Sequence, residues 1–271
     1  MDIQQLKSSK ILVIGDTCLD IFHYGKCDRI SPEAPVPVFQ TLSRITIPGM
    51  ASNVANNLSG LENEVDKIVS EHVIVKNRYV DDKTKQHLLR VDEGETRKVE
   101  ELSKTRMDEI DLSKYDAIVV SDYNKGFLSY EGIEYLLELV YEHDPDFPVF
   151  IDTKKKSLSI FDAHSNCIIK INQYEFEQLE ESNCYACELI VTLGSEGAWL
   201  PSTNSYYEAE RTEVFDVCGA GDTFLSGLVT GYLSFDKDLN KAIKLANKCA
   251  SFSVNKLGTY AIKKEDLSGI M

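Results

Sequence analysis

The chain has 271 residues, of which 43% are hydrophobic, so it can form one sizeable core or a main domain with a small appendage. Its formal charge is -15, and a field of that sign excludes nucleic acid and anionic membranes as favourable partners. No stretch reaches the roughly 18 apolar residues that span a bilayer, and the first residues lack a secretory pattern. We therefore expect a cytoplasmic protein with reduced thiols, in which Cys184 and Cys187 are ordinary buried cysteines and not half of a zinc site.

Short apolar runs rich in Val and Ile, each closed by a polar residue or glycine, alternate with helical patterns. This alternation predicts an α/β fold with a mostly parallel central sheet and helices on both faces. The predicted strands cover 11–16, 115–122, 147–153, 167–172 and 188–194. The predicted helices cover 129–144, 172–183, 219–235 and 237–258. Ligands of such sheets bind at the carboxyl ends of the strands, where the sequence places Asp16, Asp122, Asp152, Asn172 and Gly194.

Two segments depart from this alternation. Residues 21–47 contain three prolines, and residues 73–100 alternate polar with apolar side chains. Both patterns are typical of half-exposed antiparallel strands. We expect them to form a small antiparallel β lid on one domain that covers residues 1–271.

The stretch "VFDVCGAGDTFLSGL" at 214–228 puts small residues directly before a helical pattern. The backbone N–H groups of Gly219, Ala220 and Gly221, together with the N-terminus of the helix, can form an anion-binding nest. A carboxylate beside a stored phosphate would be repulsive. Asp222 is explained if it accepts the proton of a hydroxyl that attacks a phosphoryl group in transit. Alone, the same motif is more often an ordinary helix N-cap and turn.

Other polar residues complete a kinase-like set. Asn53, in "PGMASNVANNLSG", begins a helix and can bond a polyol, and Asp16 and Asp20 can accept hydroxyl bonds after the first strand. Asn172 and Glu175 lie one helical turn apart, where Glu175 can hold the water shell of Mg²⁺. Taken singly, each is more often a cap or turn residue. The chain has no P-loop motif and no dinucleotide fingerprint after its first strand.

Together, "DVCGAGDTF", "PGMASNVANNL" and "NQYE" resemble signatures of the ribokinase (PfkB) family of carbohydrate kinases. Within it, "RISPEAPVPV", "SDYNKGFLS" and "NKLGTY" are similar to the kinase half of the bifunctional heptose-phosphate kinase/adenylyltransferases of lipopolysaccharide core synthesis. This resemblance covers nearly the whole chain. It implies ATP-dependent phosphorylation of the anomeric hydroxyl of a heptose 7-phosphate.

The resemblance also implies roles for particular residues. Asp222 is the base, and Gly219, Ala220 and Gly221 form the anion hole. Asn172 and Glu175 serve the nucleotide phosphates and Mg²⁺, and Asp216 lies near a monovalent cation such as K⁺. The residues implied near adenosine are Thr192, Gly194, Gly197 and Asn247, and those implied in the sugar pocket are Asp16, Asp20, Gly49 and Asn53.

A sugar phosphate needs positive groups in this acidic chain. The candidate residues are Lys76, Arg78, Arg90 and Lys125. Each is equally compatible with a solvated charge on a strand. The resemblance further implies that the lid strands pair between subunits of a homodimer.

The sequence departs from the family in four places. Met50 stands where a second glycine is usual, and Cys218 replaces a small hydroxyl residue. The segments near 65–73 and 180–188 are shorter than the family pattern. The alternatives are therefore a kinase for another sugar or sugar phosphate, or a pseudokinase that binds sugar or nucleotide without turnover.

Overall fold

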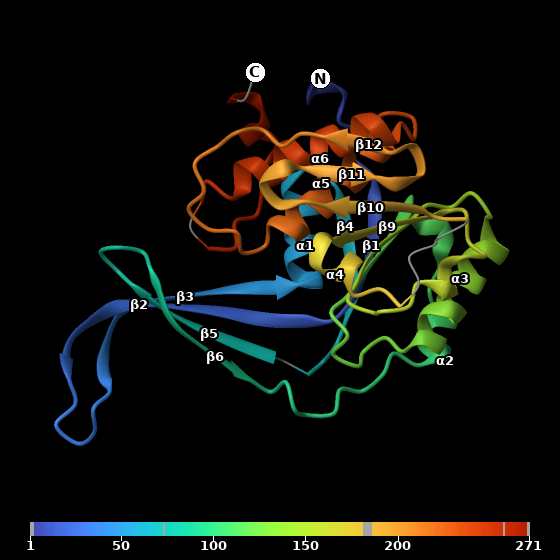
Figure 1. The fold of residues 1–271 in the computed structure, drawn as a ribbon. Helices are drawn as coiled ribbons and strands as arrows, with labels where there is room; N and C mark the ends of the chain where they lie inside the picture. Colours follow the sequence, from blue (N-terminus) through green and yellow to red (C-terminus); the bar gives the residue numbers. More distant parts are fainter. Residues whose placement is uncertain (1–2, 73, 181–185, 257, 270–271) are drawn as a thin grey trace.

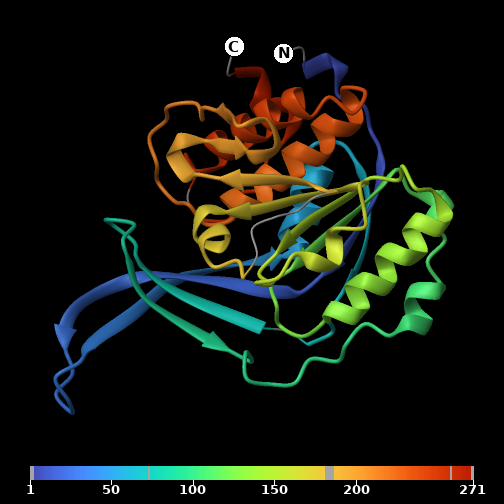
Figure 2. The same ribbon diagram turned by 45° about the vertical axis from the view of Figure 1, so that its right-hand side comes forward.

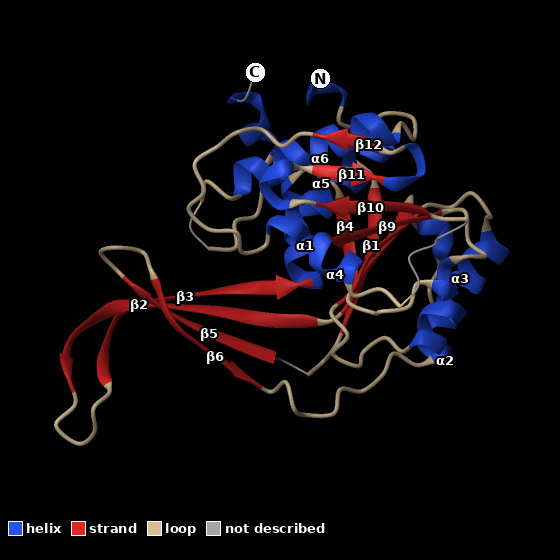
Figure 3. Ribbon diagram, in the orientation of Figure 1, coloured by secondary structure: helices blue, strands red, loops and turns tan. Residues whose placement is uncertain are grey.

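The computed structural model describes residues 3–72, 74–180, 186–256 and 258–269. The chain forms a large sheet with helices on both faces, and a second sheet projects from one end of it (Figures 1 and 3). Both termini lie at the same end of the molecule, far from the projecting sheet (Figure 1).

The large sheet has eight strands in the order β12-β11-β10-β9-β8-β7-β1-β4. Neighbouring strands from β4 to β10 are parallel, and the pairs β10–β11 and β11–β12 are antiparallel. Its strands are β1 (Lys10–Gly15), β4 (Glu64–Val69), β7 (Ala117–Asp122), β8 (Val149–Thr153), β9 (Cys167–Asn172), β10 (Glu188–Thr192), β11 (Ala198–Leu200) and β12 (Ser205–Tyr207).

All five predicted strands are confirmed within two residues at each end. The strands β4, β11 and β12 were not predicted, because β11 and β12 are only three residues long and β4 carries polar residues. The helices are α1 (Ala51–Gly60), α2 (Lys104–Asp108), α3 (Tyr130–His143), α4 (Gln173–Glu177), α5 (Ala220–Ser234) and α6 (Leu239–Ser253). Short 3-10 turns are η1 (Ile3–Gln5), η2 (Leu112–Lys114), η3 (Ser159–Phe161), η4 (Gly194–Glu196), η5 (Pro201–Thr203) and η6 (Lys264–Gly269).

Alternate residues of each central strand enter different cores, as expected for a sheet covered on both faces. In β1, Leu12 and Ile14 pack in the core that includes α3, whereas Ile11 and Val13 pack in the core that includes α1, α5 and α6. Figure 2 shows α3 separated from α5 and α6 by the sheet. The prediction of helices on both faces is confirmed.

The second sheet is the lid and has the strand order β3-β2-β5-β6. Its strands are β2 (Thr17–Ile30), β3 (Pro37–Met50), β5 (Ile74–Asp81) and β6 (His87–Glu93). A small lid from these segments is confirmed, although its two hairpins join through a parallel pair, β2–β5. The chain passes from β4 at Val69 to β5 at Ile74 almost directly, as the shortened segment predicts. Residues 181–185, with Cys184 and most of the other shortened segment, lie outside the described residues.

Met50 occupies a backbone conformation that usually needs glycine. Its φ is 56° and its ψ is -135°, directly before α1. Its side chain is buried against Cys18 and Ile74, where the lid leaves the main body. Met50 thus keeps a backbone conformation that is typical of glycine. The packing of its side chain offsets the backbone strain.

Candidate active site

The candidate site lies at the carboxyl ends of the parallel strands, where the lid and α5 meet. Asp16 follows β1, Asp122 and Asn172 end β7 and β9, and Asp152 is one residue from the end of β8. The strands are parallel, so these side chains share one edge of the sheet. This edge is the place that the sequence predicts for a ligand.

The glycine loop forms the N-terminus of α5. Gly219 is the N-cap and has a φ of 78°. A Cβ at Gly219 would lie 2.9 Å from Asn53 Nδ2 and 2.8 Å from Thr259 Cγ2, so only glycine fits. The N–H of Ala220 donates to Val217 O at 3.2 Å, whereas the N–H groups of Gly221 and Asp222 donate to no described residue. Two main-chain donors are therefore available to an anion.

Asp222 is not the N-cap but the third residue of α5, and its side chain is buried. Asn53 Nδ2 donates to Oδ2 at 2.7 Å, and the hydroxyl of Tyr123 donates to Oδ1 at 2.7 Å. Burial raises the pKa of Asp222 above 3.8, and nearby Asp152 adds to this, while the two donors and Lys170 act in the opposite direction. The result is a buried carboxylate that is a stronger base than an exposed one.

Two lysines lie beside this carboxylate. Lys170 Nζ donates to Asp152 Oδ2 at 2.7 Å, and a Cβ on Gly221 would lie 3.0 Å from the same ammonium. Lys154 pairs with Glu175 and lies 3.7 Å from Asp152 Oδ1. The N-terminus of α5 therefore lies beside two ammonium groups, each of which is paired with a carboxylate.

Asn172 and Glu175 form a complete capping box at the start of α4. Asn172 Oδ1 accepts from the N–H of Glu175 at 2.8 Å, and Glu175 Oε2 accepts from the N–H of Asn172 at 2.8 Å. The helix-cap interpretation is thus observed. The nucleotide and Mg²⁺ roles of the pair stay predictions.

Asp16 and Asp20 have different hydrogen-bond partners. Asp16 Oδ2 accepts from the backbone N–H groups of Tyr123 and Lys125 at 2.9 and 3.2 Å. Its Oδ1 is buried and has no partner among the described residues. Burial raises the pKa of Asp16. Asp20 Oδ1 instead accepts two bonds from Arg78, and a Cβ on Gly49 would lie 2.4 Å from Asp20 Oδ2.

The four predicted cations are not equivalent. Arg78 pairs with Asp20, Arg90 with Asp92, and Lys125 with Glu95. Within the part of the chain that the structure describes, Lys76 makes no ion pair, and its ammonium lies 5.8 Å from the ring centroid of Tyr123. Lys76 is thus the cation of this set that remains available to a ligand.

The residues predicted near adenosine lie after β10 and in α6. Gly194 and Gly197 bracket the turn between β10 and β11, and Thr192 Oγ1 donates to Ile171 O at 3.4 Å. Asn247 Nδ2 donates to Tyr207 O at 2.8 Å and so holds the segment after β12. Their contact with a nucleotide stays a prediction.

Asp216 precedes the glycine loop. Burial opposes its ionisation, but bonds from Cys218 and from the N–H of Gly258 lower its pKa below 3.8 overall. His87 of the lid lies 3.6 Å from Asp216 Oδ2. The predicted monovalent cation would bind beside this carboxylate.

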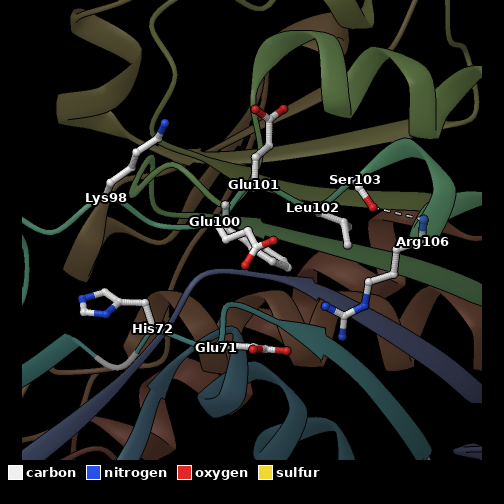
Figure 4. A pocket seen from close by; sticks show the side chains of 9 residues that line it. Glu71, His72, Lys98, Glu100, Glu101, Leu102, Ser103 and Arg106 are labelled. Carbon is white, nitrogen blue, oxygen red and sulfur yellow. Dashed lines mark hydrogen bonds between the residues drawn. The ribbon is translucent and has the colours of Figure 1, made fainter.

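Sequence reasoning missed Tyr123, Lys154 and Lys170 as members of the site. Tyr123 directly follows β7 and Lys170 is in β9, so their strand positions were the available signal. A separate pocket between α2 and the residues after β4 contains none of the predicted site residues (Figure 4). It is lined by Glu71, His72, Lys98, Glu100, Glu101, Leu102, Ser103, Arg106 and Phe127.

The fold is ribokinase-like. Potassium-bound phosphofructokinase-2 from Escherichia coli matches with a TM-score of 0.73 and 15% identity, over 97% of this chain and 98% of that one. A ribokinase from Arabidopsis thaliana complexed with ribose and ATP matches with a TM-score of 0.70 and 14% identity, over 97% of this chain and 99% of that one.

Part of the chain is similar to the pfkB family of carbohydrate kinases. Residues 167–266 match that family. Bifunctional protein HldE from Hydrogenovibrio crunogenus is 30% identical over 98% of this chain, and the one from Pseudomonas putida is 31% identical over the same share. The chain spans 64% of the length of these relatives. The alignments cover 314 residues, more than this chain has, so the relatives carry internal segments that this chain lacks.

Proposed function

We propose that the protein is an ATP-dependent sugar kinase in which Asp222 is the general base. The observation that carries this proposal is the position of Asp222. Its buried carboxylate is held by two neutral donors and lies on the same first turn as two backbone N–H groups that donate to no described residue. A protein that only binds phosphate has no need of a carboxylate there. A phosphotransferase needs both groups.

In the proposed reaction, the hydroxyl oxygen of the sugar bonds to the γ-phosphorus of ATP, and the bond from that phosphorus to ADP breaks. The hydroxyl proton moves to Asp222. The N–H groups of Gly221 and Asp222, with the ammonium of Lys170, stabilise charge on the transferred group. The lid covers the acceptor and limits transfer to water.

ATP is the proposed phosphoryl donor, and Mg²⁺ would reduce the negative charge of its phosphates. Both oxygens of Glu175 already have protein partners, Lys154 and the N–H of Asn172. These bonds fit a magnesium ion that is held mainly by phosphate oxygens and reaches Glu175 through water. By resemblance to the family, a monovalent cation such as K⁺ near Asp216 is part of the same proposal.

The proposed acceptor is a heptose 7-phosphate, phosphorylated at its anomeric hydroxyl. Asp16 supports a sugar, because its unpartnered buried oxygen can accept a bond from a hydroxyl. Lys76 supports a phosphate on that sugar, because its ammonium has no ion pair among the described residues and lies beside the Tyr123 ring. Another sugar phosphate could bond to the same two groups, Asp16 and Lys76.

The test is an ATP-consumption screen over pentoses, hexoses, hexose phosphates and heptose 7-phosphates. We expect turnover with phosphorylated acceptors and the highest kcat/KM with the heptose. Turnover only with unphosphorylated pentoses would overturn the acceptor. Nucleotide binding without turnover on any member would favour the pseudokinase.

We also propose that the protein works as a homodimer in the cytoplasm, where ATP is abundant. Large apolar side chains are exposed on the lid, and contiguous patches of that kind are typical of interfaces. They are Ile30, Leu42, Ile45, Leu88, Leu89 and Val91. No helix among the described residues is both long and apolar enough to cross a bilayer.

A further inference from the structure

Tyr123 lies where three parts of the molecule meet. Its backbone N–H donates to Asp16 Oδ2 at 2.9 Å, which fixes the start of the loop after β7. Its ring packs against Cys18, Met50 and Ile74 at the base of the lid. Its hydroxyl reaches α5 and donates to Asp222 Oδ1. One side chain thus connects the β7 loop, the lid and the proposed base.

The hydrogen bonds to the Asp222 carboxylate leave it able to accept a further bond from a substrate hydroxyl. Each carboxylate oxygen accepts one bond, from Tyr123 or from Asn53, and an oxygen has more than one acceptor position. One position on each oxygen therefore remains for the hydroxyl of the acceptor. The two donors also prevent the carboxylate from rotating away from the N-terminus of α5.

The tyrosine itself does not exchange the proton. Burial raises the pKa of Tyr123 well above 10, and the charge of Asp222 adds to this effect. The phenol thus stays protonated at neutral pH and stays a donor. Ammonium groups of Lys76 and Lys154 lie 5.8 and 5.2 Å from its ring centroid, within the range of a cation–π contact.

We propose that Tyr123 is a positioning residue for Asp222. The hydroxyl of Tyr123 keeps the Asp222 carboxylate ionised and directed at the acceptor hydroxyl. This inference rests on the proposed kinase function. It goes beyond that function by giving a role to Tyr123, which lies in the stretch "SDYNKGFLS" but is assigned none by the resemblance.

The test compares Tyr123→Phe with Tyr141→Phe, a control on the exposed face of α3. Removing a hydrogen bond to a charged group lowers kcat by about 10- to 100-fold in Tyr123→Phe, while the KM for ATP stays unchanged. A donor to the carboxylate lowers its pKa, so its loss raises the pKa of Asp222. The acidic limb of the kcat/KM profile therefore moves to higher pH. Tyr141→Phe should match the wild type.

Two results would overturn the inference: an active wild type with an unchanged pH profile in Tyr123→Phe, or a loss of rate explained by a lower unfolding midpoint. A wild type without turnover would instead overturn the proposed function. In that case, ¹³C-carboxyl titration still decides the role of Tyr123, with the Asp222 signal assigned from Asp222→Asn. The inference predicts a higher Asp222 pKa in Tyr123→Phe, and an unchanged titration rejects it.

Discussion

The central sheet and the lid differ in how far their strands are buried. Residues of β7 and β8 are buried without exception, and both faces of these strands are covered by helices. Most residues of β6 and much of β3 are exposed, and the lid has only small clusters such as Phe22, Tyr24 and Val80. Because buried apolar area stabilises a fold, the central sheet contributes most of the stability. The lid has little core of its own, because its buried apolar residues form only such small clusters.

The largest effect is expected at Asp222, where the central sheet and the lid meet. In Asp222→Asn, the amide cannot accept the proton of the acceptor, so we expect turnover to fall about 10²- to 10⁴-fold. Nucleotide affinity and the unfolding midpoint should be kept, because the shape is preserved, the remaining oxygen can still accept from Asn53, and the Tyr123 hydroxyl can accept from the new amide. ATP consumption and calorimetric nucleotide binding are the measurements. An unchanged rate would contradict the role of Asp222.

The second test compares one residue type in the two regions. Phe150 in β8 is fully buried, and Phe39 in β3 is half-buried against Tyr79. Phe150→Ala should lower the free energy of unfolding by about 3–5 kcal/mol, because it leaves a cavity that neighbours cannot fill. Phe39→Ala should cost less than half as much. Urea unfolding measures both, and equal costs would break the comparison.

The third test concerns recognition by the lid. Lys76→Ala should raise the KM for a sugar phosphate about 10- to 100-fold, because a charged hydrogen bond to phosphate is lost. The KM for ATP should change little. Lys83→Ala removes the same charge from an exposed turn of the lid and is the matched control. Equal effects of the two variants would show that Lys76 acts only through the overall field.

The smallest expected effect concerns lid pairing. Leu42→Asp places a charge on the exposed apolar surface of β3 and should weaken a dimer about tenfold or more. Tyr141→Asp makes a similar change on α3, away from the lid. Sedimentation velocity over a concentration series compares them. A monomeric wild type at all concentrations would exclude the proposed dimer.

Much of the fold could be predicted from the sequence. The runs that became β1, β7, β8, β9 and β10 are continuous and apolar, since each strand is covered on both faces. The strands β11 and β12 were not readable, because three residues carry too little pattern. The parallel pairing of β2 with β5 was not readable either, because it joins two hairpins far apart in the chain.

For the site, the local sequence indicates that a glycine loop and an acidic residue begin a helix after the last strands, since such loops need small residues at fixed spacing. The surroundings of Asp222 depend instead on how distant segments pack. Asn53, Tyr123 and Lys170 come from three distant elements, and no local spacing relates them. Their positions depend on which strands are neighbours, and pairing between strands is a property of the whole packed sheet.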